Sequence, residues 1–208
     1  GDQTTVTTGM QANFSSQKLE NYIQLGAFGT GPFFTDKFAG APGLRYKACS
    51  LADVYFTVDH QGITDEVYRR IILTAQQAYG RWGDRLPEQI RKKIEKPSDE
   101  EFVFWHCVKK RMNVDYGRLD YKGMPFSSHY VSVIGKAVLE EGGYLTNPYQ
   151  ISRYVVAPGE TYGRSPTMLV LANIKVLNEQ KRTVLRHGHR AVAPVLFAHD
   201  DGVMDAFN

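Results

Sequence analysis

A histidine and a cysteine, His106 and Cys107, stand side by side, and these residue types could do nucleophilic chemistry. A cysteine thiolate activated by a histidine is the nucleophile of one class of hydrolase. The surrounding run, Glu101–Met112, has the alternating pattern of a half-buried strand. Because neighbouring residues of a strand point to opposite faces, the two side chains cannot serve each other as base and nucleophile. We therefore expect Cys107 to be a buried structural thiol, and we predict no catalytic residue.

Three further groups of residues could bind a metal ion or a phosphate group. His187 and His189 point to different faces of a helix and have no third ligand near them in sequence, which argues against a metal site. The acidic segment His199–Asp205 is explained by turn chemistry. The glycines of Gly26–Gly31 follow a predicted helix and lack the lysine and hydroxyl residue of a phosphate-binding loop. The sequence therefore predicts no metal, no nucleotide and no cofactor.

The clearest chemical signal is a concentration of positive charge late in the chain. Ser165 and Pro166 suit the N-cap and the first position of a helix. Neither glycine nor proline follows until Gly188, so this helix should run for about 22 residues, roughly 33 Å. In its second half Glu179 is the one acidic residue, and the helix macrodipole favours cations there. The candidates for contact with DNA or with a neighbouring subunit are Lys175, Lys181, Arg182, Arg186 and Arg190.

The same helix also has an apolar side. Four apolar residues recur at the three- and four-residue spacing of a single seam, which Lys181 interrupts: Val170, Ile174, Leu177 and Val184. After the helix, Ala191–Ala198 is predicted to be a short apolar strand. Pro194 within it indicates an edge strand or an irregular one.

Before this helix the sequence predicts a body of strands with short helices between them. The expected strands are Phe33–Phe38, Leu44–Ser50, Val54–Val58, Val67–Leu73, Glu101–Met112, Ser128–Leu139 and Tyr149–Val156. The expected helices are Ala12–Leu25 with an amphipathic pattern, Thr74–Arg81 with Thr74 as N-cap and Gly83 as terminator, and Leu86–Glu95. Turns are expected at Gly40–Gly43, Asp59–Gly62 and Gly142–Gly143, and a polar loop over Asn113–Phe126.

Composition limits the classes of protein. The chain has 208 residues, of which 42% are hydrophobic and 23% charged, enough for one domain with a core or for two small ones. A net charge of +3 does not by itself indicate nucleic acid. No apolar run approaches about 18 residues, and polar residues 1–11 lack the apolar segment of a signal peptide, so we expect a flexible arm there and no membrane partner. Cys49 and Cys107 define neither a disulfide framework nor a zinc site.

The most specific pattern begins just before the long helix. A turn is followed by two short helical motifs and an acidic turn, in the order Gly159, Glu160, Tyr162, Gly163, Arg164 and Pro166, then Ile174-Lys175 and Leu177-Asn178, then Asp200-Asp201-Gly202. This order resembles the head-to-tail connecting (portal) proteins of short-tailed bacteriophages. Asn173 stands where that family usually has Asp, and Val176 where it often has Thr. Earlier matches also follow the family's order, among them Gly29-Thr30-Gly31, Asp59–Gly62, Gly143-Tyr144 and Arg153.

The resemblance implies an α+β fold, with an antiparallel β-rich body, short inserted helices and one long C-terminal helix. In the terms of that family, residues 1–11 would be a flexible arm and residues 12–158 the wing. Residues 159–190 would be the turn and a helix of the stem, and residues 191–208 the truncated start of the clip. The strand with His106, Val108 and Arg111 would belong to the wing sheet and have no catalytic role.

The resemblance also implies a function. Portal proteins form a ring, dodecameric in this family, at one vertex of the capsid, and DNA passes through the ring during packaging and ejection. The implied partners are further copies of the chain, the capsid, the terminase, tail adaptor proteins and double-stranded DNA without sequence specificity. The implied location is the virion, assembled in the cytoplasm of the bacterial host.

Two other classes of function stay open from the residues alone. A generic DNA-binding module could use the same basic helix and would show strong, salt-dependent binding. A small α+β hydrolase would require a pocket that brings His106, His129 or Cys107 against a carboxylate.

Overall fold

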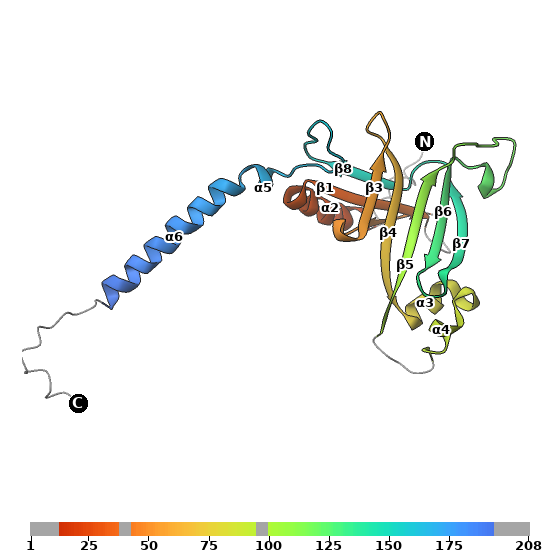
Figure 1. Ribbon diagram of the computed structural model, residues 1–208, viewed down its shortest axis with the longest axis horizontal. Coiled ribbons are helices and arrows are strands. Elements are labelled where there is room, and N and C mark those ends of the chain that lie inside the picture. Colours follow the sequence, from red (N-terminus) through yellow and green to blue (C-terminus); the bar gives the residue numbers. More distant parts are fainter. Residues whose placement is uncertain (1–12, 38–42, 95–99, 194–208) are drawn as a thin grey trace, which may run out of the picture. The chain divides into compact units, whose positions relative to one another are not determined.

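The computed structural model of the chain describes residues 13–37, 43–94 and 100–193. Its contacts divide the chain into two units, a body that extends to Met168 and a C-terminal unit that begins at Leu169. The body contains two antiparallel sheets with short helices, and one long helix follows in the C-terminal unit (Figure 1). The expected α+β class, with a β-rich antiparallel body and a long C-terminal helix, is confirmed.

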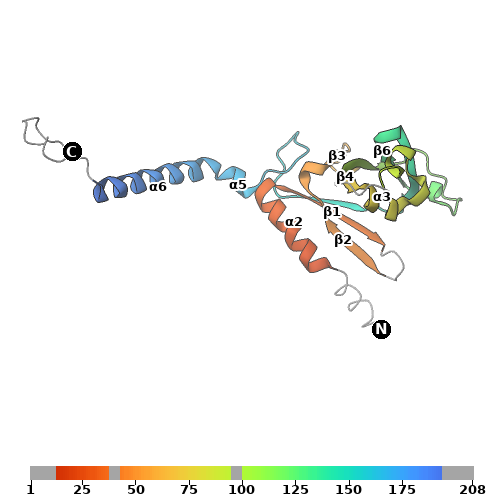
Figure 2. The same cartoon turned by 90° about the horizontal axis from the view of Figure 1, so that it is seen from below.

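The smaller sheet has the strand order β2-β1-β8. Its antiparallel strands are β1 (Thr30–Lys37), β2 (Leu44–Ala48) and β8 (Tyr149–Arg153). Helix α2 (Phe14–Phe28) packs on this sheet and ends where Gly29 adopts a left-handed conformation, φ 76°, which favours glycine. Successive residues of β1 face opposite sides, since the Phe33 ring contacts Phe14 of α2 whereas the Phe34 ring contacts His106 of the larger sheet. Helix α2 and the larger sheet therefore lie on opposite faces of the smaller sheet (Figure 2).

Helix α2 is attached to the smaller sheet through polar side chains. The Asn13 amide donates to the backbone oxygen of Tyr46 (2.9 Å) and accepts from its N–H (3.2 Å). The Gln17 side chain accepts from the N–H of Ala48 (2.8 Å), and Gln24 does the same for the segment after β2. These side chains satisfy backbone groups along an edge strand, which would otherwise be free to pair with another chain.

Three apolar residues of α2 point away from the smaller sheet. Leu19, Tyr22 and Ile23 are 61%, 57% and 63% exposed, although their spacing is typical of a face that packs on a core. The sequence pattern predicted the amphipathic helix, but the polar side of the helix is the one that faces the sheet.

The larger sheet has the order β3-β4-β5-β6-β7, in which every strand pairs with its sequence neighbour. Its antiparallel strands are β3 (Val54–Val58), β4 (Thr64–Thr74), β5 (Glu101–Lys110), β6 (Phe126–Ser132) and β7 (Ala137–Tyr144). Helices α3 (Ala75–Trp82) and α4 (Glu88–Arg91) lie against one end of it (Figure 1). The predicted N-cap of α3 is present: the Thr74 hydroxyl accepts from the N–H of Gln77, whose side chain accepts from the N–H of Thr74.

Two apolar clusters form the core, both on the inner face of the larger sheet. One lies under α3 and α4 and contains Trp82, Leu86, Ile90, Phe104 and Leu139. The other lies between the two sheets and contains Phe34, Val54, Val67, Val108 and Tyr149. Burial of these side chains holds the two sheets and the two short helices together as one body.

The long helix differs in detail from its prediction. A short helix, α5 (Pro166–Leu169), comes first, and Val170 has non-helical angles, φ −102° and ψ 6°. Helix α6 (Leu171–Val192) then runs for 22 residues. Gly188 does not end it, because a glycine inside a helix costs only about 1 kcal/mol. Ala191 and Val192 are therefore helical instead of starting a strand, and the rest of the expected strand at 194–198 lies outside the described residues.

Three predictions for the body are also corrected. The expected strand Ser128–Leu139 is two strands, separated by a turn at Ile134–Lys136 in which Gly135 (φ 77°) and Lys136 (φ 46°) are left-handed. The expected turn at Gly142–Gly143 lies inside β7, where both residues pair with β6. The expected helix Leu86–Glu95 is helical only over α4, which begins after Pro87.

Candidate assembly site: the turn and the basic helix

The motif turn, residues 159–166, packs closely against the segment that follows α2. The N–H of Gly163 donates to the hydroxyl of Thr30 (2.9 Å), and the N–H of Tyr154 donates to the backbone oxygen of Gly29 (2.9 Å). A Cβ atom on Gly29 would overlap the backbone of Arg164, and one on Gly163 would overlap the oxygen of Gly29. Only glycine fits at either position. The close approach to Gly29 therefore explains why position 163 of the turn is a glycine.

Two side chains join the same turn to the larger sheet. The Arg153 guanidinium donates to the backbone oxygens of Gly62 (2.6 Å), in the β3–β4 hairpin, and of Thr161 (3.3 Å), in the turn. The Tyr162 ring meets the Phe56 ring edge to face, with centroids 4.8 Å apart. The turn is thereby tied to both sheets of the body.

The remaining motif residues shape the turn itself. Gly159 is left-handed, with φ 83°. The Arg164 guanidinium donates to both carboxylate oxygens of Glu160, and these hydrogen bonds lower the pKa of that exposed carboxyl. Ser165 accepts from the N–H of Met168 (3.0 Å), so the predicted cap is present and Pro166 opens α5 as predicted.

The start of α5 is also fixed to the end of α2. The Thr167 hydroxyl donates to the backbone oxygen of Gly26 (3.0 Å), one of the carbonyl groups at the C-terminal end of α2. The turn and the first residues of α5 therefore form part of the body, and α6 belongs to the C-terminal unit.

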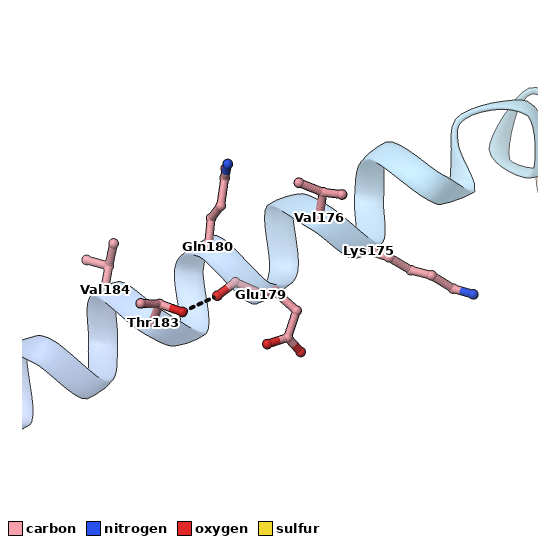
Figure 3. A pocket seen from close by; sticks show the side chains of 6 residues that line it. All are labelled: Lys175, Val176, Glu179, Gln180, Thr183 and Val184. Carbon is pink, nitrogen blue, oxygen red and sulfur yellow. Dashed lines mark hydrogen bonds between the residues drawn. The ribbon is translucent and has the colours of Figure 1, made fainter.

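The helix α6 separates its predicted basic residues into two groups. At about 100° per residue, Lys175, Arg182, Arg186 and Arg190 share one face with Glu179. Lys181 lies on the opposite, apolar face, among Ile174, Leu177 and Val184. Figure 3 shows the side chains of Lys175 and Glu179 on one side of the helix and those of Val176, Gln180 and Val184 on the other. Four of the five candidates can thus act on one partner, and Lys181 cannot join them.

The surface along α6 is open. Six residues line a shallow hollow on the helix (Figure 3): Lys175, Val176, Glu179, Gln180, Thr183 and Val184. All six belong to this one helix, so the hollow has no opposing wall and is not a ligand pocket. Every residue of α6 is exposed, including its apolar seam.

The structure gives His106 a structural role. It is fully buried, with Nδ1 2.6 Å from the hydroxyl of Tyr149 and Nε2 2.9 Å from the hydroxyl of Ser128, and its ring stacks on Tyr130 at 4.0 Å. Burial holds the pKa of His106 well below its usual range, with a further contribution from the positive charge of Arg69. A neutral imidazole with both nitrogens engaged and no exposed surface does not act as a base on a bound molecule.

Cys107 lies on the outer face of the sheet, away from His106, as the strand pattern required. It is half-buried, in contrast to the expectation of full burial, whereas Cys49 is buried. The strand register places His129 between Cys107 and Glu141, which is the order of a nucleophile, a base and a carboxylate. No hydrogen bond within the described residues joins these three side chains, and burial raises the pKa of the Cys107 thiol. The thiol is therefore not activated as a nucleophile.

Comparison with known proteins identifies the family. The family model described as "Bacteriophage head to tail connecting protein" matches residues 5–208. The chain belongs to this family. Among the similar members are a protein named "Portal protein" from Salmonella phage epsilon15 (29% identical over 167 residues) and one named "Probable portal protein" from Bordetella phage BPP-1 (24% over 164 residues). Each match covers 77% of this chain, and the chain spans about 30% of the length of these relatives.

The match to the head to tail connecting family includes the turn at residues 159–166. Sequence reasoning found the turn through the resemblance but missed Thr30 as the acceptor for Gly163 and Arg153 as the link to the hairpin. The role of Gly29 in ending a helix does have a local signal in the sequence, because a glycine that follows a helical pattern commonly ends the helix. Among the described helices none is long and apolar enough to cross a membrane, and the described residues hold no cluster of three metal-ligating side chains.

Proposed function

We propose that this chain is part of a structural portal subunit of a bacteriophage capsid. One observation carries the proposal: a 22-residue helix with a basic face opposite an apolar seam has all of its residues exposed. An isolated helix of this length is marginal in water, and most helices depend on packing of their apolar face. The seam has the spacing of a helical bundle, and in the proposed ring its partners are the same helix from neighbouring subunits.

The proposal assigns the body to the wing of the portal and α6 to its stem. Further copies of the chain, with twelve expected in the full-length ring, are the first partners. The capsid, the terminase and the tail adaptor are the others, and the virion is the location, after assembly in the host cytoplasm. The role is structural and requires no catalytic residue, metal or cofactor.

The basic face of α6 is the proposed contact with DNA or with an acidic surface of the next subunit. A channel through which DNA slides requires contacts to the phosphate backbone and not to base edges. Lys175, Arg182, Arg186 and Arg190 provide such charge along one line, with Glu179 as the one acidic residue among them.

Charge reversal on this face tests the proposal in the full-length protein. We expect Arg182→Glu with Arg186→Glu to reduce DNA packaging at least tenfold while the body stays folded. The matched control reverses two exposed arginines of the body, Arg85→Glu with Arg91→Glu, and should package normally. Normal packaging by the α6 variant would sink the idea, and circular dichroism of both variants verifies the fold.

A generic DNA-binding module is the second candidate, because the four basic residues of one face could contact phosphates in the isolated chain as well. Four phosphate contacts would give a salt slope of about −4 in a plot of log affinity against log salt. The portal proposal expects only weak binding by the isolated chain, in which no ring gathers the basic faces. Measurement of affinity at several salt concentrations separates the two.

A further inference from the structure

The body has two exposed apolar surfaces. The first, here called the α2 ridge, consists of Leu19, Tyr22 and Ile23, each more than half exposed. These residues are exposed because α2 uses its polar side chains to hold the edge of β2. Exposed apolar clusters of this kind usually mark interaction surfaces.

The second surface, here called the outer sheet face, lies on the larger sheet away from the core. Five residues line a shallow apolar depression there: Tyr55, Tyr68, Trp105, Cys107 and Val131. The register sets them side by side across three strand pairs, and the Tyr55 and Trp105 rings lie 5.9 Å apart. No described helix or strand of the body covers this depression. Tyrosine and tryptophan in such a position are the residue types that contribute most to protein interfaces.

Two basic side chains at the outer sheet face are paired within the chain, whereas Glu141 of β7, on the same face, has no ion pair among the described residues. Arg70 pairs with Asp53 (2.8 Å) and Lys109 pairs with Glu66 (3.5 Å). These two pairs therefore add no net charge that would repel a second copy of the chain or select an oppositely charged partner.

The two surfaces lie on opposite sides of the body. Phe33 of β1 faces α2 and Phe34 faces the larger sheet, so the order of layers is α2, smaller sheet, larger sheet (Figure 2). The α2 ridge is the outside of the first layer, and the outer sheet face is the outside of the last. A head-to-tail contact between identical subunits joins two different surfaces of one chain, and this body carries an apolar surface on each of two opposite sides.

We propose that the α2 ridge of one subunit packs into the outer sheet face of the next subunit around the ring. This inference rests on the proposed function, which supplies the ring. The occupant of each surface is a second copy, because one chain carries both halves of a contact that closes under rotation. The α2 ridge consists of three residues and the depression of five, against roughly 20–30 residues a side in a standard interface. The contact therefore holds within a closed ring and does not hold two isolated copies together.

A crosslinking experiment on the assembled full-length protein tests this contact. Native Cys107 already lines the depression and Cys49 is buried, so Ile23→Cys supplies the second thiol in a full-length protein whose cysteines outside residues 1–208 are replaced by serine. A short bismaleimide should then link neighbouring subunits into a ladder of covalent multimers that extends to the whole ring. Adding Cys107→Ser to the Ile23→Cys variant should abolish the ladder. Gln76→Cys, an exposed position on α3 at the inner side of the larger sheet, should give none.

A second measurement separates the contact from the fold. We expect Leu19→Asp with Ile23→Asp to lower the yield of rings at least tenfold, while Gln76→Asp leaves it unchanged and both melt at the temperature of the native protein. Rings that form at full yield with the two aspartates and give no ladder with Ile23→Cys would overturn this contact but keep the portal function. If the native full-length protein forms no rings in electron micrographs, the proposed function itself fails.

Discussion

Two glycines of the body, Gly29 and Gly163, are important because they have no side chain. Gly29 and Gly163 approach so closely that each would place a Cβ atom inside the backbone of the other segment. The hydroxyl of Thr30 then accepts from the N–H of Gly163 across 133 residues of sequence. The turn is thus held within the body by close backbone packing and one hydroxyl group, which the side-chain chemistry of the sequence does not reveal.

The tightness of this contact gives a stability prediction. We expect Gly163→Ala to lower the free energy of unfolding of the body by about 2 kcal/mol or more, because the added methyl group meets the rigid oxygen of Gly29. The control is Gly26→Ala in α2, where a Cβ meets nothing within 4 Å. That change should be neutral or stabilise by about 0.5–1 kcal/mol. Urea unfolding followed by tryptophan fluorescence measures both, and equal stabilities would contradict the explanation.

His106 gives a prediction about pH. Its pKa in the folded protein is lowered, by burial first and by the charges of Arg69 and Arg81 next, so the folded state keeps it neutral while the unfolded state takes up a proton below about pH 6.5. The stability from this group is complete above that pH. It is lost as pH falls below it, by up to about 1.4 kcal/mol per pH unit.

The matched variant is His106→Gln, which keeps a donor and an acceptor for Ser128 and Tyr149 but does not titrate. We expect the native protein to lose stability between pH 7 and pH 5 more steeply than this variant. Denaturant midpoints at several pH values supply the measurement. Parallel pH profiles would rule out His106 as the cause.

At the scale of elements, helices α2 and α6 differ in which of their sides are exposed. Helix α2 satisfies the edge of β2 with its polar side and leaves an apolar ridge exposed. Helix α6 is exposed on all sides and has a seam that Lys181 interrupts. A charged residue within such a seam usually fixes the register or number of helices at a cost in stability.

This role of Lys181 can be tested directly. Lys181→Leu would complete the seam, and we expect the ring of the full-length protein to dissociate at a higher temperature as a result. Lys175→Leu, on the basic face, serves as control and should leave the temperature unchanged. Native electrophoresis after heating detects the rings. A lower dissociation temperature for Lys181→Leu would place this lysine outside the seam contact.

Local signals in the sequence predicted most elements, but not the pairing of strands that lie far apart in the sequence. Thr74 and Ser165 were found as caps because their partners lie three residues away. The turn at Gly135 and Lys136 was missed, because nothing in an apolar run marks a left-handed lysine. The pairing of β1 with β8 joins residues more than a hundred positions apart, and the inverted attachment of α2 depends on the free edge of β2, so neither follows from periodicity.

At the scale of the whole molecule, the proposed contacts are individually small. The isolated chain should therefore be a monomer at micromolar concentration, even though it carries both the body and α6. Light scattering over a range of concentrations measures its mass. A large closed ring formed by this chain alone would show that the body and α6 suffice for assembly.

The order of strand pairing sets an order of folding. The larger sheet pairs each strand with its sequence neighbour, so loop closure costs little and this sheet can form early. The smaller sheet is complete only after β8 has paired with β1. The hydrogen bond between Gly163 and Thr30 can form only after the turn that follows β8 has folded. The turn that precedes α5 is consequently fixed among the last events in the folding of the body. For the proposed ring, we therefore expect that fixing of this turn is a late step of folding that precedes assembly of the subunit.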